Sequence, residues 1–146
     1  MNQENKEVCL VPVGGLANRM RAIVSVLNAC QKAGVKLKIV WFRNRELNAP
    51  FYSLFNPLRS LNVTVKEAAR IDFFRYYRPV KKNLWLSKYY LRSHFDKVLS
   101  MTDCIPIVRD EQNLVNLISE TERLYIESCY DMGSYRNIRE IMSPNR

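Results

Sequence analysis

One stretch near the start of the chain limits its fold more than any other. Residues 8–34, VCLVPVGGLANRMRAIVSVLNACQKAG, pass from an apolar run at 8–13 through two glycines into a pattern of helical period. Another apolar run, at 37–42, follows directly. Short apolar runs of this kind are typical of strands buried on both faces, as in parallel sheets. The stretch therefore predicts a strand, a helix and a second strand, joined by a right-handed crossover.

The predicted helix is amphipathic. At about 100° per residue from Asn18, apolar and polar side chains separate onto two faces of the helix. The apolar face carries Met20, Ile23, Val24, Leu27 and Cys30, and the polar face carries Arg21, Ser25, Asn28 and Lys32. Gly34 stands where a left-handed residue is favoured, so we expect the helix to end there.

The rest of the chain continues this alternation of strands and helices. We expect a short helix around 51–55, strands at 61–65, 105–108 and 124–126, and the beginning of another helix in 134–146. Asp110 is placed to cap a further helix, whose buried stripe would be Leu114, Val115, Leu117 and Ile118. The pattern predicts an α/β fold, with one three-layer, Rossmann-like domain over residues 1–146 and a mainly parallel sheet.

The composition fits a folded domain and points to anionic partners. Hydrophobic residues make up 47% and charged residues 25% of the 146 residues, as in globular proteins. No apolar run approaches the length of a membrane span, and the first residues lack the apolar segment of a signal peptide. Four widely spaced cysteines suit free thiols in a reducing cytoplasm. The net charge of +9 favours polyanions, anionic lipid or phosphate-bearing small molecules.

Residues 70–92 form a basic, aromatic segment, with seven basic and seven aromatic residues against the single acid Asp72. In one interpretation a helix stripe packs on the core while the lysines are solvated, the stripe being Leu84, Leu91, Phe95 and Val98. In another, the segment binds an anionic membrane surface or a partner through Arg75, Arg78, Lys81, Lys82, Trp85 and Lys88. Nucleic acid is not expected, because no RNA- or DNA-binding motif accompanies the segment.

Two arginines at the start of the first predicted helix need an explanation. A cation in the first turn opposes the helix dipole by about 0.3 to 1 kcal/mol. One explanation is an anion held by backbone N–H groups after Gly14 and Gly15, and by the guanidinium of Arg19 or Arg21. Asn18 would add an amide donor.

The alternative is an ordinary strand-to-helix turn with solvated arginines, since the loop is neither a Walker loop nor GxGxxG. Arg19 also lies beside Val26 and Cys30 on the helical wheel, at the edge of the apolar stripe. It could therefore be partly buried and structurally paired, which would leave Arg21 as the more available cation.

The segments GGLANRMRAI and IVWFRNRELNAPFYSLF resemble the amino-terminal half of the fucosyltransferase-like glycosyltransferases. This group has two Rossmann-like domains and includes the nodulation and α1,6-fucosyltransferases and the protein O-fucosyltransferases. The resemblance covers residues 8–57, and beyond them only the strand at 124–126 and the SCY at 128–130 look similar. It implies that the glycine-rich loop faces an interdomain cleft and helps hold the diphosphate of a GDP-sugar. The positions that match are Gly14, Gly15, Leu16, Ala17, Asn18 and Arg19, with Arg21 as a looser inference.

The chain departs from the family in one respect. The family's second domain carries an H-x-R-R-x-D-like motif whose arginine neutralises the leaving diphosphate, and this chain has no such motif. Its single histidine, His94, lies in a helix-like stretch where a structural histidine is expected. We therefore expect one half of a GT-B-like enzyme, without the nucleotide-clamping second domain and inactive by itself. The full-length enzyme would use a GDP-sugar donor and a glycan acceptor, such as a bacterial surface polysaccharide.

Few residues are candidates for acid or base chemistry. Glu46 follows the second predicted strand, where the carboxyl end of the sheet would bring it near the cleft; a solvated loop carboxylate is the alternative. No His/Cys group has metal-ligand spacing, so no metal or other cofactor is expected. A different function is a non-catalytic basic module that docks on anionic membrane or another chain through residues 70–92. We expect the protein in the cytoplasm, with peripheral attachment at the inner face of the membrane in that second case.

Overall fold

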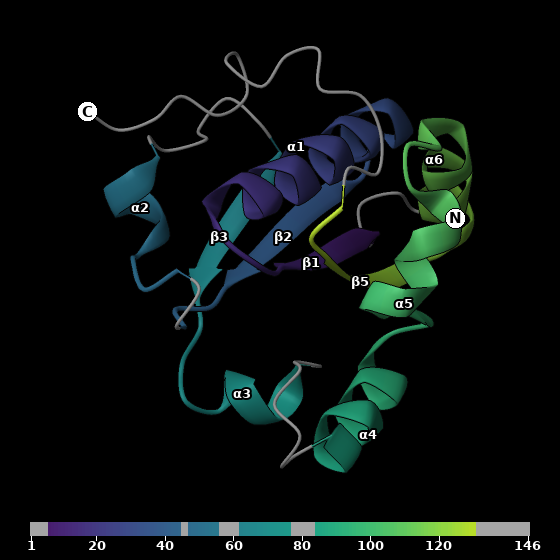
Figure 1. The fold of residues 1–146 in the computed structure, drawn as a ribbon. Helices are drawn as coiled ribbons and strands as arrows, with labels where there is room; N and C mark the ends of the chain where they lie inside the picture. The colour runs from purple at the N-terminus through teal and green to yellow at the C-terminus, as the bar shows by residue number, and fades with distance from the viewer. Residues whose placement is uncertain (1–5, 45–46, 56–61, 77–83, 131–146) are drawn as a thin grey trace.

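The computed structural model describes residues 6–44, 47–55, 62–76 and 84–130 (Figure 1). Within these ranges five strands form one sheet in the order β3-β2-β1-β5-β4, and every neighbouring pair is parallel. The strands are β1 (Glu7–Pro12), β2 (Lys36–Trp41), β3 (Val63–Glu67), β4 (Lys97–Leu99) and β5 (Arg123–Ser128). The strand nearest the amino terminus therefore lies at the centre of the sheet.

Helices cover both faces of this sheet. They are α1 (Leu16–Ala33), α2 (Phe51–Leu54), α3 (Asp72–Arg75), α4 (Leu84–His94), α5 (Met101–Cys104) and α6 (Glu111–Glu120), with a 3₁₀ turn, η3, at Ile105–Ile107. In Figure 1, α1 and α6 lie on one side of the sheet, and α3 and α4 lie on the other. The expected three-layer, Rossmann-like α/β fold is confirmed, and the described sheet is entirely parallel.

The connections that carry α1, α6 and the pair α3 and α4 have the same hand. The steps from β1 to β2 and from β4 to β5 run in one direction along the sheet and place α1 and α6 on the same face. The step from β3 to β4 runs in the opposite direction and places α3 and α4 on the opposite face. Reversing both the direction and the face preserves the hand, as expected if every crossover obeys the right-handed rule.

The sheet separates two hydrophobic cores because alternate side chains of a strand point to opposite faces. Val8 and Leu10 of β1 belong to the core beneath α1 and α6. Cys9 and Val11 of the same strand belong to the core beneath α3 and α4, which also contains Tyr76. Burial on both faces accounts for the continuous apolar runs from which the strands were predicted.

The strand, helix and strand predicted from residues 8–42 are all present. Gly34 ends α1 with φ 69°, and its N–H lies within hydrogen-bond reach of the carbonyls of Cys30 and Gln31. One detail of the helix was wrong: Ser25, placed on the polar face, is fully buried. It is tolerated there because its hydroxyl donates to the carbonyls of Arg21 at 2.8 Å and Ala22 at 3.1 Å.

The region before α6 corrects two predictions. Residues 105–107 form η3 and not a strand, because the capping box of Ser100 and Asp103 starts α5, which runs directly into it. The edge strand is β4 instead, and it includes Val98, which had been assigned to a helix stripe. Helix α4 ends at His94, because Asp96 pairs with Arg123 of β5: its N–H donates to the Arg123 carbonyl and its carboxylate accepts from the Arg123 N–H, both at 2.9 Å.

The remaining predicted elements are present in the described residues, although Val115 and Leu117 of the stripe predicted on α6 are only partly buried. Asp110 caps α6, accepting from the N–H of Asn113 at 3.2 Å, and Leu114 and Ile118 are buried on the inner face. The strand predicted at 124–126 is part of β5, and that at 61–65 is β3, displaced toward the carboxyl end. The helix predicted in 134–146 lies outside the described residues.

Candidate functional site at the carboxyl end of strand β1

The glycine-rich loop connects the central strand to α1. Gly14 has φ +95°, a conformation that residues with a side chain rarely adopt. A Cβ at Gly14 would also lie 3.1 Å from Cβ and 3.2 Å from Nδ2 of Asn18. Gly15 is extended, with φ −74°, and a Cβ there would meet nothing within 4 Å. The first glycine is therefore required by the turn, and the second leaves open space beside the start of the helix.

The amino-terminal end of α1 is uncapped. Among the described residues no side chain caps this end, and its first turn contains no acid. The N–H groups of Leu16, Ala17 and Asn18 have no acceptor within the helix, since the first intrahelical bond runs from the Arg19 N–H to the Gly15 carbonyl at 3.0 Å. Leu16 and Ala17 are exposed. An anion could therefore reach these donors and the positive end of the helix dipole.

Arg19 is completely buried at the same edge of the sheet. Its Nε donates to the Gly14 carbonyl at 2.7 Å, its Nη1 to the Phe42 carbonyl at 2.6 Å, and its Nη2 to Oδ1 of Asn44 at 3.1 Å. The guanidinium carbon also lies 4.6 Å from the ring centroid of Trp41. The interpretation of Arg19 as structurally paired is confirmed, and its burial is complete where only partial burial was expected. A buried guanidinium needs partners of this kind.

These bonds explain why a cation occupies the first turn of α1. Arg19 joins the loop that follows β1 to the segment that follows β2. Asn44 Oδ1 also accepts from the N–H of Leu47 at 3.1 Å. The Arg19 side chain therefore holds both segments next to the start of α1. Its hydrogen bonds outweigh the small free-energy cost of placing a cation against the helix dipole.

Arg21 differs from Arg19 in every respect. It is exposed, and its Nη1 donates to Oδ1 of Asn18 at 3.0 Å. Since α1 begins at Leu16, Arg21 lies in the second turn, so it opposes the dipole less than its sequence position suggested. The Asn18 Oδ1 is occupied by Arg21, which leaves the amide NH₂ group of Asn18 beside Gly14. Arg21 is an exposed cation close to the uncapped helix end.

Sequence reasoning missed a buried acid in the strand next to β1. Glu127 is paired in register with Val11 and is fully buried. Its Oε2 accepts from the hydroxyl of Tyr125 at 3.4 Å. Burial, and then the charge of Glu127, raise the pKa of Tyr125 well above its ordinary value. A glutamate within an otherwise apolar strand was the available signal.

Three of the four cysteines are buried. No disulfide joins the four cysteines, all of which lie in the described ranges. Burial raises the pKa of Cys9, Cys30 and Cys104 from 9.0 to about 12 each, so these thiols stay protonated at neutral pH. None of the three is suited to act as a nucleophile.

The structure divides the predicted basic patch. Arg75 is half-buried; its Nη1 lies 3.8 Å from Oδ1 of Asp72, and its guanidinium lies 5.7 Å from the Tyr90 ring centroid. Asp72 is itself fully buried and also accepts from Nζ of Lys66 at 3.1 Å. Lys88 is exposed on α4. Glu46, Arg78, Lys81, Lys82 and the side chain of Trp85 lie outside the described residues.

His94 has the structural role expected of it. Its Nδ1 lies 2.9 Å from the Tyr90 carbonyl, and its ring stacks on the Tyr90 ring with centroids 4.0 Å apart. The side chain is exposed at the end of α4. Nothing in this arrangement places it near the loop after β1.

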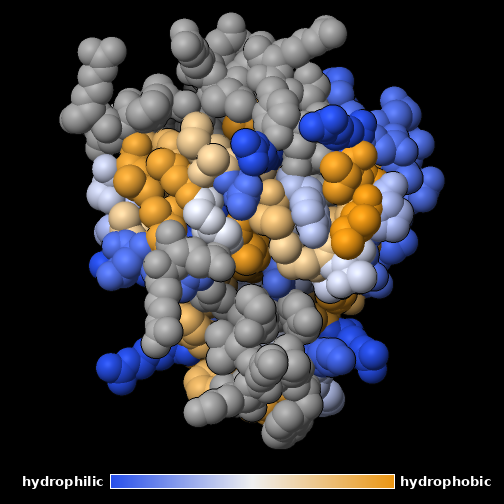
Figure 2. Space-filling model, in the orientation of Figure 1, coloured by the Kyte–Doolittle hydropathy of each residue, from blue (hydrophilic) through white to orange (hydrophobic). Residues whose placement is uncertain are grey.

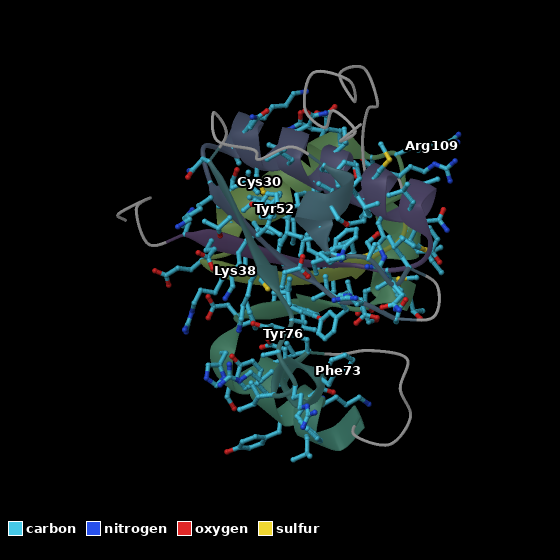
Figure 3. The ribbon with its side chains drawn as sticks, turned by 90° about the vertical axis from the view of Figure 1, so that its left-hand side faces the viewer. Cys30, Lys38, Tyr52, Phe73, Tyr76 and Arg109 are labelled. Carbon is cyan, nitrogen blue, oxygen red and sulfur yellow. The ribbon has the colours of Figure 1, made fainter. Side chains whose placement is uncertain are left out.

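Large apolar side chains are exposed at the α3–α4 end of the molecule. They are Ile71 (52% exposed), Phe73 (42%), Phe74 (46%) and Tyr89 (74%). Phe73, which Figure 3 labels, also packs its ring on Phe42, the residue that follows β2, with centroids 4.9 Å apart. Figure 2 shows hydrophilic residues on both flanks of this end. We call Ile71, Phe74, Tyr89 and the neighbouring cations Arg70, Lys88 and Arg92 the α3–α4 surface.

None of the helices in the described residues combines the length and the apolar character that crossing a bilayer requires. No three His, Cys, Asp or Glu side chains in these ranges are grouped so that they could hold a metal ion. Comparison of the chain with protein-family models, with curated proteins and with solved structures found no match.

Proposed function

We propose that this chain is the amino-terminal domain of a sugar-nucleotide-dependent glycosyltransferase similar to the fucosyltransferases. One observation carries the proposal: the uncapped, exposed amino-terminal end of α1 follows a glycine turn at the carboxyl end of the central parallel strand. In parallel α/β sheets, ligands bind outside the carboxyl ends of the strands. The sequence resemblance over residues 8–57 supports a GDP-sugar as that ligand.

In the proposed site, residues of the loop after β1 and the start of α1 have different roles in binding a diphosphate. The N–H groups of Leu16, Ala17 and Asn18 donate to phosphate oxygens, and Gly14 and Gly15 let the backbone approach them. Arg21 adds a guanidinium from the exposed face. Arg19 does not reach the ligand in this scheme, because its donors are used on Gly14, Phe42 and Asn44. It positions the loop.

The chemistry supported here is electrostatic. Transfer of a sugar from GDP leaves negative charge on the departing diphosphate, and donors aimed at that charge lower the barrier. A second domain would supply the opposing clamp and complete the glycan site. By itself this domain is inactive and binds GDP in the millimolar range, corresponding to about 4 kcal/mol of binding free energy. Glu46 stays the candidate base from the sequence.

A GDP titration followed by ligand-detected NMR tests this function. Arg21→Ala should weaken GDP binding a few-fold and leave the melting temperature nearly unchanged, because the side chain is exposed and lies beyond the first turn of the helix. Lys36→Ala is the matched control, since it removes the same charge from an exposed position at the amino-terminal end of β2, opposite the carboxyl ends of the strands. Unchanged binding together with a clear loss of stability would make Arg21 a structural residue and the loop only a turn.

A second function is favoured by the α3–α4 surface. Exposed apolar side chains next to cations suit the interface of an anionic membrane, where the rings enter the headgroup layer and the cations meet lipid phosphates. We propose it as the alternative: a basic module that docks on anionic membrane without catalysis.

Co-sedimentation with phosphatidylcholine vesicles, with and without phosphatidylserine, separates the two functions. The docking module should bind only the anionic vesicles, and the double variant Phe74→Ser, Tyr89→Ser should lose that binding. Both side chains are exposed, so the variant is expected to fold. GDP binding without vesicle binding would reject the docking module in favour of the transferase domain.

A further inference from the structure

A cavity of about 360 Å³ opens between α4 and the segment that runs from β4 into α5. Its lining residues are Lys88, Leu91, Arg92, Val98, Ser100 and Asp103. This volume lies within the range of small-molecule sites. The cavity is on the α3–α4 side of the sheet, at the end of edge strand β4, and the diphosphate site proposed above does not use it. Only Lys88 and Arg92 are shared with the α3–α4 surface.

One wall of the cavity is cationic. Lys88 and Arg92 are four residues apart on α4, so their side chains project from the same face of the helix. Both are exposed, and the ion pairs found among the described residues involve neither of them. Two like charges at this spacing repel each other unless an anion lies between them. An oxyanion that accepts from both would remove that repulsion.

The opposite wall carries the capping box of α5. Oδ2 of Asp103 accepts from the Ser100 N–H at 3.0 Å and from the Ser100 hydroxyl at 2.9 Å. No hydrogen bond within the described part of the chain uses Oδ1 of Asp103. The carboxylate is therefore held in one orientation and keeps an oxygen that can accept a further hydrogen bond. It also makes the site unfavourable for a bare anion, which would meet this second negative charge.

The floor of the cavity is apolar. Leu91 is 1% exposed and belongs to the core beneath α4, and Val98 packs against that core. A ligand that fits has an anionic group at one end, a hydrogen-bond donor at the other and carbon between them. We propose that this cavity binds a phosphate monoester of a small polyol. The phosphate lies between Lys88 and Arg92, and a hydroxyl of the polyol donates to Asp103.

The proposal is tested on the whole chain by NMR titration with myo-inositol 1-phosphate and with inorganic phosphate. The polyol phosphate should bind more tightly and should shift the amide signals of residues 88–92 and 100–103. Arg92→Gln should weaken it at least about five-fold, because a charge-assisted hydrogen bond is lost. Lys36→Gln, at the amino-terminal end of β2, is the matched control and should bind as the parent does. Equal behaviour of the two variants would overturn the proposal.

Asp103→Asn tests the polyol end of the ligand. The asparagine carbonyl can still accept from the Ser100 N–H, so the cap of α5 is retained. The preference for inositol 1-phosphate over inorganic phosphate should fall several-fold. If both ligands gain affinity by the same factor, the carboxylate only repels anions and the polyol assignment is wrong.

The phosphate monoester can belong to a free metabolite or to a lipid headgroup, and vesicles separate these sources. Binding to phosphatidylcholine vesicles that contain phosphatidylinositol 4-phosphate, lost in Arg92→Gln and displaced by inositol 1-phosphate, indicates the lipid. Binding of the soluble ligand with no vesicle binding indicates the metabolite. Vesicle binding that inositol 1-phosphate does not displace, and that the double variant Phe74→Ser, Tyr89→Ser abolishes, would place the lipid on the α3–α4 surface and overturn the proposal for this cavity.

Discussion

Arg19 at one end of the molecule and the pair Lys88 and Arg92 at the other differ in burial and in the groups that they contact. At the carboxyl end of β1, Arg19 is fully buried and donates to three acceptors in two chain segments. At the α3–α4 end, Lys88 and Arg92 are exposed beside a cavity and form no ion pair within the described residues. A buried guanidinium must be matched by the protein, whereas an exposed one remains available to a ligand. Basic residues alone therefore do not indicate a binding site, and their burial decides which role each one has.

The largest effect that would break this comparison comes from Arg19. Arg19→Ala should lower the free energy of unfolding by about 3 to 5 kcal/mol, because it leaves buried carbonyls without donors and opens a cavity. Urea denaturation measures the loss. Arg92→Ala is the control and should change stability by less than about 0.5 kcal/mol, since the side chain is exposed. Similar losses in both variants would remove the distinction between the two ends.

High pH should destabilise the core beneath the α3–α4 layer. Burial raises the pKa of Cys9 from 9.0 to about 12. It also raises the pKa of Tyr76 and of Tyr125 well above the ordinary value of a tyrosine. The folded protein therefore keeps protons that the unfolded chain releases, so this stability is present below pH 9 and is lost as the pH rises toward 12.

Denaturation midpoints measured across that pH interval would show the decline. Tyr76→Phe should reduce its steepness, because one of the titrating groups is gone. Tyr52→Phe, which changes an exposed tyrosine, should leave the steepness as in the parent. A stability that is independent of pH over this interval would contradict the burial of these groups.

A smaller effect separates the two glycines of the loop. Gly14→Ala should cost about 1 to 3 kcal/mol, because φ is positive there and the new Cβ would meet Asn18 at 3.1 Å. Gly15→Ala should change stability by only about 0.5 kcal/mol, since its backbone is extended and the position is open. Thermal unfolding of both variants tests this difference. Equal losses would mean that the turn does not depend on the conformation of Gly14.

The parts of the fold that could be predicted from the sequence are those with local signals. The unit from β1 to β2 has two apolar runs, a helical period and Gly34, and the cap of α6 has Asp110. Strand β4 could not be predicted, because three residues at a sheet edge carry almost no pattern. The apolar residues at 105–108 led to a false strand prediction. Pro106 and the capping box before it favour a helical turn instead.

The candidate site was predictable in its backbone and not in its side chains. The glycine turn and the helix start are adjacent in sequence, so their geometry follows from local rules. The acceptors of Arg19 do not: Phe42 and Asn44 lie 23 and 25 residues away and meet it only because β2 pairs with β1. The helical wheel could indicate that Arg19 lies at the edge of the apolar stripe. It could not name the partners that make its burial possible.

The smallest expected effect tests whether the end of α1 is open to an anion. Ala17→Glu places a carboxylate at an exposed position in the first turn, where it should complement the helix dipole. Compared with the neutral Ala17→Gln, it should raise the free energy of unfolding by about 0.3 to 1 kcal/mol at low salt, and added salt should reduce the gain. The same carboxylate occupies the place proposed for the diphosphate, so GDP binding should weaken in Ala17→Glu more than in Ala17→Gln.

Stability and GDP affinity then change in opposite directions, which loss of folding cannot produce. If the two variants have equal stability and equal GDP affinity, the N–H groups of Leu16, Ala17 and Asn18 are not available to a ligand. The amino-terminal end of α1 would then not be an anion site.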